Sequence, residues 1–335
     1  MIKYIIKRLA ISIVILLGVS IIIYTMVRLM PNDYVDTKYA SQLQNGTITL
    51  EEIAHFKSLY GIGDNSFKGI VGGYLKWIGN MVQGDLGTSF KYERPVGQVI
   101  SENMWISFAI AVIATILQFA ISVPLGIGSA THQYSIRDYA VTFFTMVGIS
   151  LPTYFFAAIV VKIFAVDLGI FPPSGLISAT ANYPEGFIGE MQKLLDIAHH
   201  LFLPILVSVL LSIGGLMRYT RTNMLEVLNA DYIRTARAKG LSEKTVVYKH
   251  AFRNTLIPLV TMLAGILPSL FGGMMITEQV FGIDGIGRLA YQALREGDIP
   301  FVMGYNMFLA ILTVIGTLLS DIMYSVVDPR VKLGK

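Results

Sequence analysis

Four ionisable residues lie within or at the ends of long apolar stretches of this 335-residue chain and are the first candidates for chemistry: Lys162, Asp167, Glu278 and Asp321. An ionisable side chain in such a stretch is costly to bury, so it usually has a partner or a function. Lys162 and Asp167 stand near the end of their stretch, where both side chains can reach water. For Glu278 and Asp321 we predict a structural hydrogen bond or ion pair, in preference to a proton relay.

The spacing of these residues does not assemble a catalytic site. A carboxylate pair for acid–base catalysis would have to combine Glu278 with Asp321, which helical periodicity cannot bring together. The sequence lacks a GxxxxGK[ST] phosphate loop, so this chain is not expected to bind and hydrolyse ATP by itself. The glycine-rich run 282–287 has no strand–turn–helix context and does not predict a dinucleotide site. We therefore predict a chain that is not an enzyme.

Metal and thiol chemistry is not indicated either. The chain contains no cysteine, which excludes disulfides and thiolate metal sites. His199 and His200 are the only close pair among its five histidines. A metal ion could use them, but a polar position at a membrane edge accounts for them more simply. No metal site and no cofactor of this chain is predicted.

Composition indicates a membrane protein. Hydrophobic residues make up 54% of the chain and charged residues 14%, with a mean hydropathy of +0.61; soluble proteins carry about 25% charged residues. Segments of roughly 20 apolar residues can cross a bilayer as helices. Six such segments occur: 9–30, 105–130, 139–166, 201–217, 256–280 and 302–327. The sequence therefore predicts an all-α, polytopic protein with six transmembrane helices, the first of them retained instead of cleaved as a signal peptide.

Positive charge orients these helices. Fifteen of the 26 Lys and Arg residues lie in four segments that would share one side: the amino-terminal tail, 129–138, 218–254 and the carboxyl tail. Because Lys and Arg resist translocation, both termini and the 218–254 loop are expected in the cytoplasm. The predicted divisions are a tail with the first helix (1–30), an extracellular segment (31–103), a five-helix core (104–327) and a cytoplasmic tail (328–335).

Three amphipathic helices are expected outside the spans. Thr49 and Glu52 resemble a capping box that opens a short helix through Tyr60. A second helix carries apolar residues at helical spacing: Tyr74, Leu75, Ile78, Met81 and Val82. The third, residues 187–198, is expected to lie along the outer surface, apart from the fourth span. Each could contact a partner protein or pack against the spans or lipid headgroups.

The most polar part of the core is the basic run 219–254. Together with Arg218 it holds eight of the 26 Lys and Arg residues. At its centre a short helical run is stopped by Gly240, and a new helix starts at Ser242. Such a two-helix elbow on the inner face is built to dock onto another protein. A solvated loop that only orients the chain would need neither the glycine nor the small Ala236 between charges.

A series of short motifs runs through the chain in a fixed order. They are Arg8-Leu9, Gly84-Asp85-Leu86-Gly87-Thr88-Ser89-Phe90 with Pro95-Val96, Leu151-Pro152-Thr153-Tyr154-Phe155, the 232–242 elbow, His250-Ala251-Phe252-Arg253-Asn254, Glu278-x-x-Phe281-Gly282 with Gly285-x-Gly287-Arg288-Leu289, and Asp321-x-x-Tyr324 with Asp328-Pro329-Arg330. In this order and spacing they resemble the membrane permease subunits of peptide-importing ABC transporters, in the first-permease branch of the dipeptide and oligopeptide systems. The resemblance covers nearly all of the chain.

Three departures from the family pattern stand out. The Pro-Gly-Asp-Pro that often follows the first span is Pro31-Asn32-Asp33-Tyr34 here, which affects only the local loop shape. Importer permeases carry a Glu-Ala-Ala-x3-Gly loop, whose positions here hold Arg234, Thr235, Ala236 and Gly240. That variant is itself usual in the peptide branch. Asp284 stands where a proline is expected before the Gly-x-Gly, which affects only the local loop shape.

The resemblance implies a type I importer permease that works with a second homologous permease and two cytoplasmic ATPases, which bind ATP and Mg²⁺. It also implies an extracellular peptide-binding protein, contact with membrane lipid and no nucleic acid. The elbow would be the coupling helix that fits a groove in an ATPase, through these residues: Asp231, Tyr232, Arg234, Thr235, Ala236, Arg237, Lys239 and Gly240. Ala236 would permit close approach to the ATPase, and the basic side chains could pair with its acidic groups.

Other functions remain open at this level. Nickel and glutathione importers share these motifs, so peptide is not the only cargo that fits. A secondary transporter would commonly show inverted repeats, which are not found in the sequence, and would leave the elbow unexplained. A membrane receptor or scaffold is disfavoured by the family resemblance alone. The substrate-binding residues are not readable from the sequence.

Overall fold

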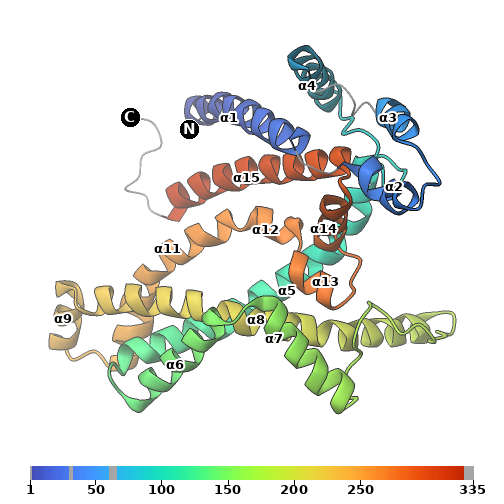
Figure 1. The fold of residues 1–335 in the computed structure, drawn as a ribbon. Helices are drawn as coiled ribbons and strands as arrows, with labels where there is room; N and C mark the ends of the chain where they lie inside the picture. Colours follow the sequence, from blue (N-terminus) through green and yellow to red (C-terminus); the bar gives the residue numbers. More distant parts are fainter. Residues whose placement is uncertain (1, 30–32, 60–65, 328–335) are drawn as a thin grey trace.

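The computed structural model describes residues 2–29, 33–59 and 66–327, and this part of the chain is almost entirely helical (Figure 1). Its one β-bridge pairs Thr88 with Pro95. The helices are α1 (Ile2–Arg28), α2 (Tyr34–Gln44), α3 (Leu50–Leu59), α4 (Phe67–Val82), α5 (Val96–Thr131), α6 (Ile136–Ser150), α7 (Thr153–Val160), η1 (Val161–Asp167), α8 (Phe187–Leu228), α9 (Asp231–Ala238), α10 (Glu243–Thr245), η2 (Val246–Ala251), α11 (Phe252–Gly265), α12 (Leu267–Gly272), α13 (Met275–Val280), α14 (Ile286–Glu296) and α15 (Ile299–Val327), where η marks a π-helix. The predicted all-α fold is confirmed.

Four of these helices, α1, α5, α8 and α15, are long and apolar enough to cross a membrane. Helix α6 and the segment α7–η1 are together long and apolar enough for a fifth span, as a broken span or a re-entrant loop, and they bend by 104° at the break between them. Pro152 explains the break, because a proline disfavours the helical conformation of the residue before it. Leu151 is accordingly extended, with φ −82° and ψ 129°.

The fifth predicted span along the chain, 256–280, is not a single helix. It is divided into α11, α12 and α13. Pro268 stands in the first turn of α12, and Gly273, with φ +76°, ends that helix in a conformation that side-chain-bearing residues rarely adopt. Within the described residues the count of spanning helices therefore reaches five, and the prediction of six is not confirmed.

The helix expected along the outer surface, 187–198, turns out to be the first part of α8. The prediction of two separate elements was wrong, because no glycine or proline separates the amphipathic stretch from the span and Pro204 is accommodated within the helix. The 42 residues of α8 extend about 63 Å at 1.5 Å per residue. A bilayer core is about 30 Å thick, so α8 must project beyond it.

The centre of the protein is the contact between α5 and α8, which pack along much of their length. Gly126 of α5 lies against Thr220 of α8, where a Cβ would come within 2.7 Å of the threonine. Ser122 Oγ donates a hydrogen bond to the carbonyl of Ile213 at 3.1 Å. Small and hydrogen-bonding residues at such a contact let membrane helices approach closely.

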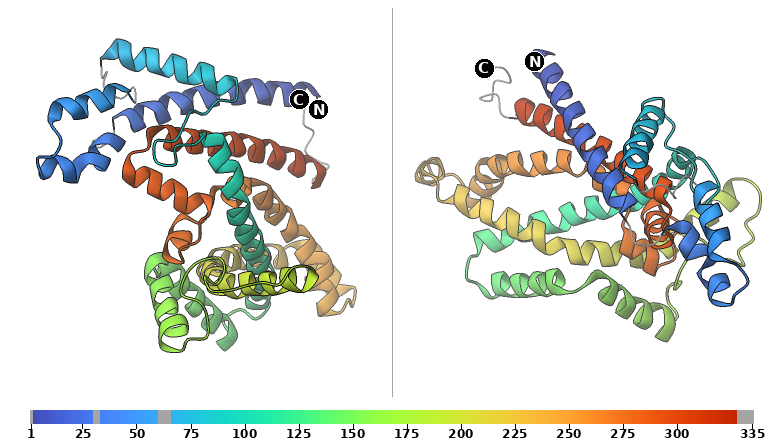
Figure 2. Two further views of the ribbon diagram at one scale, coloured as in Figure 1. Left: turned by 90° about the vertical axis from the view of Figure 1, so that its right-hand side faces the viewer. Right: turned by 45° about the horizontal axis from the view of Figure 1, so that its top comes forward.

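The two ends of the molecule differ in what they carry. The beginning of α1, the end of α15 and the short helix α9 lie at one end, on the left of Figure 1. Helices α2 and α3 lie at the other end, and the views in Figure 2 show the same separation. This arrangement matches the predicted grouping of the termini with the basic loop.

The helices of the 31–103 segment follow their sequence signals. Thr49 Oγ1 accepts a hydrogen bond from the Glu52 amide at 3.2 Å, and a Glu52 carboxylate oxygen accepts one from the Thr49 amide at 2.8 Å. The predicted capping box is thus confirmed, and α3 begins directly after Thr49. The second predicted helix is α4. Tyr60, where the first was expected to end, lies outside the described residues.

Candidate functional site

The elbow predicted from the sequence is present as α9 followed by α10. Gly240 has φ +77° and stops α9, and Ser242 caps α10 by accepting a hydrogen bond from the Thr245 amide. Because only glycine enters the left-handed region without cost, the turn between the two helices depends on residue 240. The elbow stands at one end of the molecule (Figure 1).

One face of α9 packs against the protein itself. Ile233 is fully buried and Ala236 is 7% exposed, in a cluster with Met224 of α8 and Val246 and Val247 of η2. The small side chain of Ala236 permits close packing of α9 against its own chain.

The other face of α9 is open to solvent. Its exposed side chains are Asp231, Tyr232, Arg234, Thr235, Arg237 and Lys239. Arg237 has an internal partner, since its Nε and Nη2 donate to the Glu243 carboxylate at 3.1 and 2.7 Å. The hydrogen bonds from Arg237 hold the pKa of Glu243 below its usual value. Arg237 therefore braces the elbow from α9 to α10, which differs from the expected pairing with an acidic partner group.

A second unusual feature is the break between α12 and α13, which is organised by Glu278. Glu278 is 1% exposed. Its carboxylate accepts hydrogen bonds from Ser107 Oγ of α5 at 2.7 Å, from the Met274 amide at 2.9 Å and from the Arg288 amide at 2.9 Å. Ser107 Oγ in turn accepts from the Ile286 amide at 2.9 Å. One carboxylate thus satisfies the amino-terminal ends of both α13 and α14, where unpaired N–H groups and the helix dipoles favour negative charge.

The glycines of the Gly-x-Gly motif are explained by this carboxylate. A Cβ on Gly285 would come within 2.5 Å of both the Glu278 carboxylate and Ser107 Oγ, and one on Gly287 within 2.8 Å of the Met275 amide. The sequence showed that this run was not a dinucleotide site. Its role in admitting a buried carboxylate could not be seen, because Ser107 is 171 residues away from Glu278.

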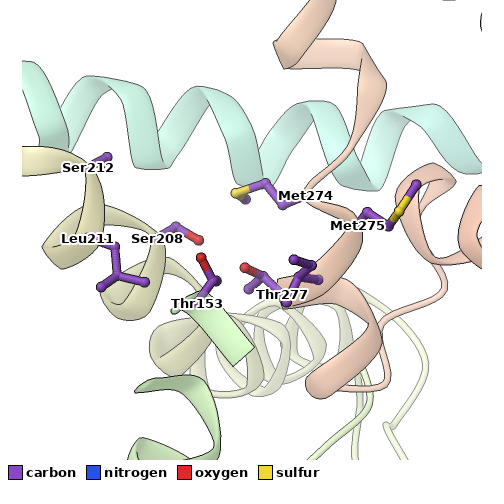
Figure 3. A pocket seen from close by; sticks show the side chains of 8 residues that line it. Thr153, Ser208, Leu211, Ser212, Met274, Met275 and Thr277 are labelled. Atoms are coloured by element: carbon purple, nitrogen blue, oxygen red, sulfur yellow. The ribbon is translucent and has the colours of Figure 1, made fainter. Parts of the chain in front are cut away.

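Beside the same break lies a pocket of about 470 Å³, lined by Thr153 of α7, by Ser208, Leu211 and Ser212 of α8, and by Met274, Met275, Ile276 and Thr277. Figure 3 shows the hydroxyl groups of Thr153, Ser208 and Thr277 directed into the same space, next to the Met274 side chain. Its lining contains no charged residue. Such a pocket offers weak polar contacts and adaptable thioether surface.

The remaining ionisable candidates lie apart from this pocket. Asp321 of α15 pairs with Arg8 of α1, with Nη2 and Oδ2 3.0 Å apart. Lys162 and Asp167 pair with each other at 2.6 Å on an exposed surface. His199 contacts the Ile170 carbonyl at 2.9 Å, and no group of three or more His, Asp or Glu side chains suited to a metal ion occurs among the described residues.

Comparisons with known proteins identify the family. The family described as binding-protein-dependent transport system inner membrane component matches residues 122–333. The chain is 37% identical to the oligopeptide transport system permease protein AppB of Bacillus subtilis over 333 residues, which is 99% of this chain and all of that one. The chain belongs to this family of membrane transport components.

Further relatives agree with this assignment. The permease is 33% identical over 342 residues to the dipeptide transport system permease protein DppB of Alkalihalophilus pseudofirmus, covering 99% of this chain and all of that one. It is 33% identical over 328 residues to a putative peptide transport system permease of Brucella abortus, covering 98% of each. A solved structure of the methionine ABC transporter MetNI, in inward-facing conformations, aligns with a TM-score of 0.49 at 18% identity over 69% of this chain and 97% of that chain. The family resemblance expected from the motifs is confirmed, and the permease is a multi-pass membrane protein.

The Gly84–Phe90 motif of the permease has a structural partner that sequence reasoning missed. Asp298, fully buried before α15, accepts hydrogen bonds from Ser89 Oγ and from the amides of Phe90 and Lys91 at 3.1 and 3.0 Å. It also accepts one from the Phe301 amide at 3.2 Å, as an N-cap does. The pattern of aspartate followed two residues later by Pro300 was a readable helix start. The hydrogen bonds of Asp298 to residues 89–91, more than 200 positions earlier, could not be read from the sequence.

Asp138 is a second residue of the permease that was missed. It is buried and receives both Nε and Nη2 of Arg221, each at 2.9 Å, together with Ser129 Oγ. The three residues belong to α6, α8 and α5. Bidentate pairing of this kind fixes the base of the α8 segment that leads into the elbow. Arg221 was noted in the sequence only as part of the positive charge of the loop.

Proposed function

We propose that this chain is a permease subunit of an ATP-driven, type I importer that carries peptides across the cytoplasmic membrane. The observation that carries the proposal is its similarity, along the whole chain, to a permease named for oligopeptide transport. Relatives named for dipeptide and peptide transport support the same cargo. The uncharged pocket beside the α12–α13 break supports it as well, because a route for varied side chains should not hold any one charge tightly.

The elbow is proposed to couple transport to ATP hydrolysis in partner chains. Residues 231–245 form two short helices, α9 ended by Gly240 and α10 capped by Ser242, and the Arg237–Glu243 pair braces them into a unit that can move as a rigid body. The solvent-facing side chains Tyr232, Arg234, Thr235 and Lys239 are the proposed contact with an ATPase. Gly240 sets the turn. Ala236 acts indirectly, by seating α9 on its own chain.

The other components follow from the family. A second homologous permease would complete the pathway, two cytoplasmic ATPases would bind ATP and Mg²⁺, and an extracellular protein would deliver the peptide. This chain would then contribute no catalytic residue and no cofactor. Glu278 and Asp321 are proposed to be structural, because the first joins two helix ends and the second pairs α15 with α1.

The proposed orientation places both termini and the 218–254 loop in the cytoplasm and the 31–103 segment outside. Since the chain has no cysteine, single cysteines can report on sidedness without background. A membrane-impermeant thiol reagent applied to intact cells should label Lys68→Cys and leave Lys244→Cys unmodified. Labelling of position 244 with protection of position 68 would reverse the orientation.

Growth on peptides tests the cargo. A strain that lacks this gene and requires one amino acid should fail to grow when that amino acid is supplied only within peptides, and the intact gene should restore growth. Free amino acid is the matched control. Nickel or glutathione import is the alternative with the same architecture. Normal growth on every di- to octapeptide tried, together with loss of nickel or glutathione uptake, would replace the peptide proposal with that alternative.

A further inference from the structure

Helix α4 carries an apolar stripe that none of the described residues covers. Phe67 is 82% exposed and Val82 is 80% exposed, and Val71 and Leu75 between them are exposed as well. These four residues fall on one side of the helix at a spacing of 3.6 residues per turn. Scattered exposed apolar side chains are ordinary, but a stripe along the whole length of a 16-residue helix indicates an interaction surface.

The rest of α4 is divided into two further faces. The face next to the stripe packs against the protein through Ile70, Tyr74, Trp77 and Met81. Lys68 lies on the flank next to the stripe, and the face opposite the stripe holds Lys76 and Asn80; all three are exposed. Lysines on one side and Phe, Leu and Trp on the other are typical of helices that lie in the plane of a membrane surface.

The contacts of α4 locate it against a helix that crosses the membrane. Tyr74 shares a hydrogen bond of 2.9 Å with Ser20 of α1, and the Tyr24 ring lies 5.5 Å from Tyr74 and 6.0 Å from Trp77. Tyrosine and tryptophan gather at the level of lipid headgroups. The two helices lie side by side in both views of Figure 2.

The surface of α1 beside this contact is itself lipid-facing. Ile13, Leu17 and Ile21 are exposed on the flank of α1 next to Ser20 and Tyr24, and α1 is long and apolar enough to cross the bilayer. The α4 stripe therefore stands beside a helix whose neighbouring exposed surface is apolar and faces lipid in a membrane. A water-soluble partner would have to displace lipid at this level to reach it.

We propose that α4 is an in-plane membrane helix, with Phe67, Val71, Leu75 and Val82 inserted among the acyl chains of the leaflet farther from the elbow. Lys68 and Lys76 face water and the lipid phosphates, where their charge is favourable. The segment 31–103 is then anchored to the lipid surface through α4, in addition to its covalent link to α1. This inference rests on the membrane location of the chain and is independent of its cargo.

Spin labels can show whether lipid or another protein covers the apolar stripe of α4. Single cysteines replace Leu75 or Val82 on the stripe and Lys76 or Asn80 on the opposite face, in the full-length chain within isolated cell membranes. All four positions are exposed, so no packed side chain is removed. Each nitroxide is then tested for its access to molecular oxygen, which concentrates in lipid, and to a water-soluble nickel chelate.

The stripe positions should be more accessible to oxygen than to the chelate, and positions 76 and 80 should show the reverse. The logarithm of the ratio of oxygen access to chelate access should therefore change sign between the two faces. Equal access to the chelate on both faces would show that the stripe is in water and overturn the proposal. Low access of Leu75→Cys and Val82→Cys to both reagents would show that a protein, such as a second permease or a binding protein, covers the stripe, and would overturn it too.

Discussion

The elbow at α9 and the break between α12 and α13 both interrupt a helical path, but they satisfy their helix ends in opposite ways. At the elbow, Gly240 ends α9 and Ser242 caps α10. The other backbone N–H and C=O groups at these helix ends are open to water, and the Arg237–Glu243 pair is exposed. At the inner break the caps come from Glu278, which is buried and bonded to groups on three helices. An exposed break can be specified locally, whereas a buried one has to draw its partners from distant parts of the chain.

The difference has a functional consequence. On the outer face of α9, Arg237 braces the elbow and Tyr232 bonds to Asn254. Among the described residues Arg234 pairs only with Asp231, of the same helix, and Lys239 is exposed, so these two cations are available to a partner. At the inner break every polar group of Glu278 is used within the chain, and the adjacent pocket offers only hydroxyls and thioethers. Changes at Glu278 should therefore damage the protein itself, and changes on the elbow should damage its coupling.

The largest effect is expected for Glu278→Ala. The substitution leaves the amides of Met274 and Arg288 and the Ser107 hydroxyl without their buried acceptor, at a cost of about 3 kcal/mol or more. Glu278→Gln should lower the stability less than Glu278→Ala does, because the glutamine keeps one acceptor oxygen. It should still destabilise the native chain, because its amide group would point a donor at a backbone N–H donor. The thermal unfolding midpoint of the purified protein in detergent measures this, with exposed Glu226→Ala as the control. An unchanged midpoint for Glu278→Ala would remove the contrast between the two breaks.

Ala236→Glu should come next. The new carboxylate would enter the cluster around Ile233 and detach α9 from α8 and η2, at about 2 kcal/mol. Thr235→Glu adds the same charge at a neighbouring exposed position and is the matched control. Hydrogen exchange across 224–251 should accelerate in the first variant alone. Equal exchange in both would show that position 236 is not a packing position.

Gly240→Val should have a smaller effect on folding and a large one on transport. A β-branched residue at φ +77° is strained by about 1–2 kcal/mol, although no atom lies within 4 Å of the new Cβ. The α9–α10 turn should shift, and peptide uptake should fall while the protein still accumulates in the membrane. Gly240→Asn, which tolerates the left-handed region, should retain most uptake. Loss of uptake in both variants to the same degree would mean that the turn geometry is not the cause.

The smallest effect is expected from pH at the Arg237–Glu243 pair. The pKa of Glu243 is lowered in the folded protein, so the pair stabilises the elbow above the usual glutamate pKa and loses this effect as pH falls through the folded value. Because both side chains are exposed, the change is worth less than about 1 kcal/mol. Hydrogen exchange of 231–245, corrected for intrinsic rates, should rise in acid in the native chain and not in Glu243→Gln. The same rise in both chains would assign it to another group.

Sequence reasoning succeeded where the signals are local. Hydrophobic length and charge predicted the helical class and the membrane location, and the glycine stop at Gly240 with the cap at Ser242 predicted the elbow. The family motifs predicted the family. The faces of α9 were less readable, because eight residues of helix do not reveal which side the rest of the chain will cover.

The failures lie where contacts are long-range. Ser107, a partner of Glu278, and Ser89, a partner of Asp298, come from segments more than 170 residues away, and nothing near Glu278 or Asp298 identifies them. The division of 256–280 into three helices follows from Pro268 and Gly273, yet membrane helices often tolerate such residues, as α8 does with Pro204. Whether a proline breaks a helix depends on hydrogen-bond partners for the backbone carbonyls that it leaves free. Other helices supply these partners, so the outcome cannot be read from the local sequence.

The central claim is that the exposed face of α9 contacts an ATPase, and cross-linking at two neighbouring positions tests it most directly. Arg234→Cys lies on the exposed face and Ala236→Cys on the buried one, in a chain that has no other cysteine. With a short thiol-to-amine cross-linker in the assembled transporter, the cysteine at 234 should join this chain to an ATPase subunit and the cysteine at 236 should not. No cross-link from 234 in a complex that still contains the ATPase would contradict the account.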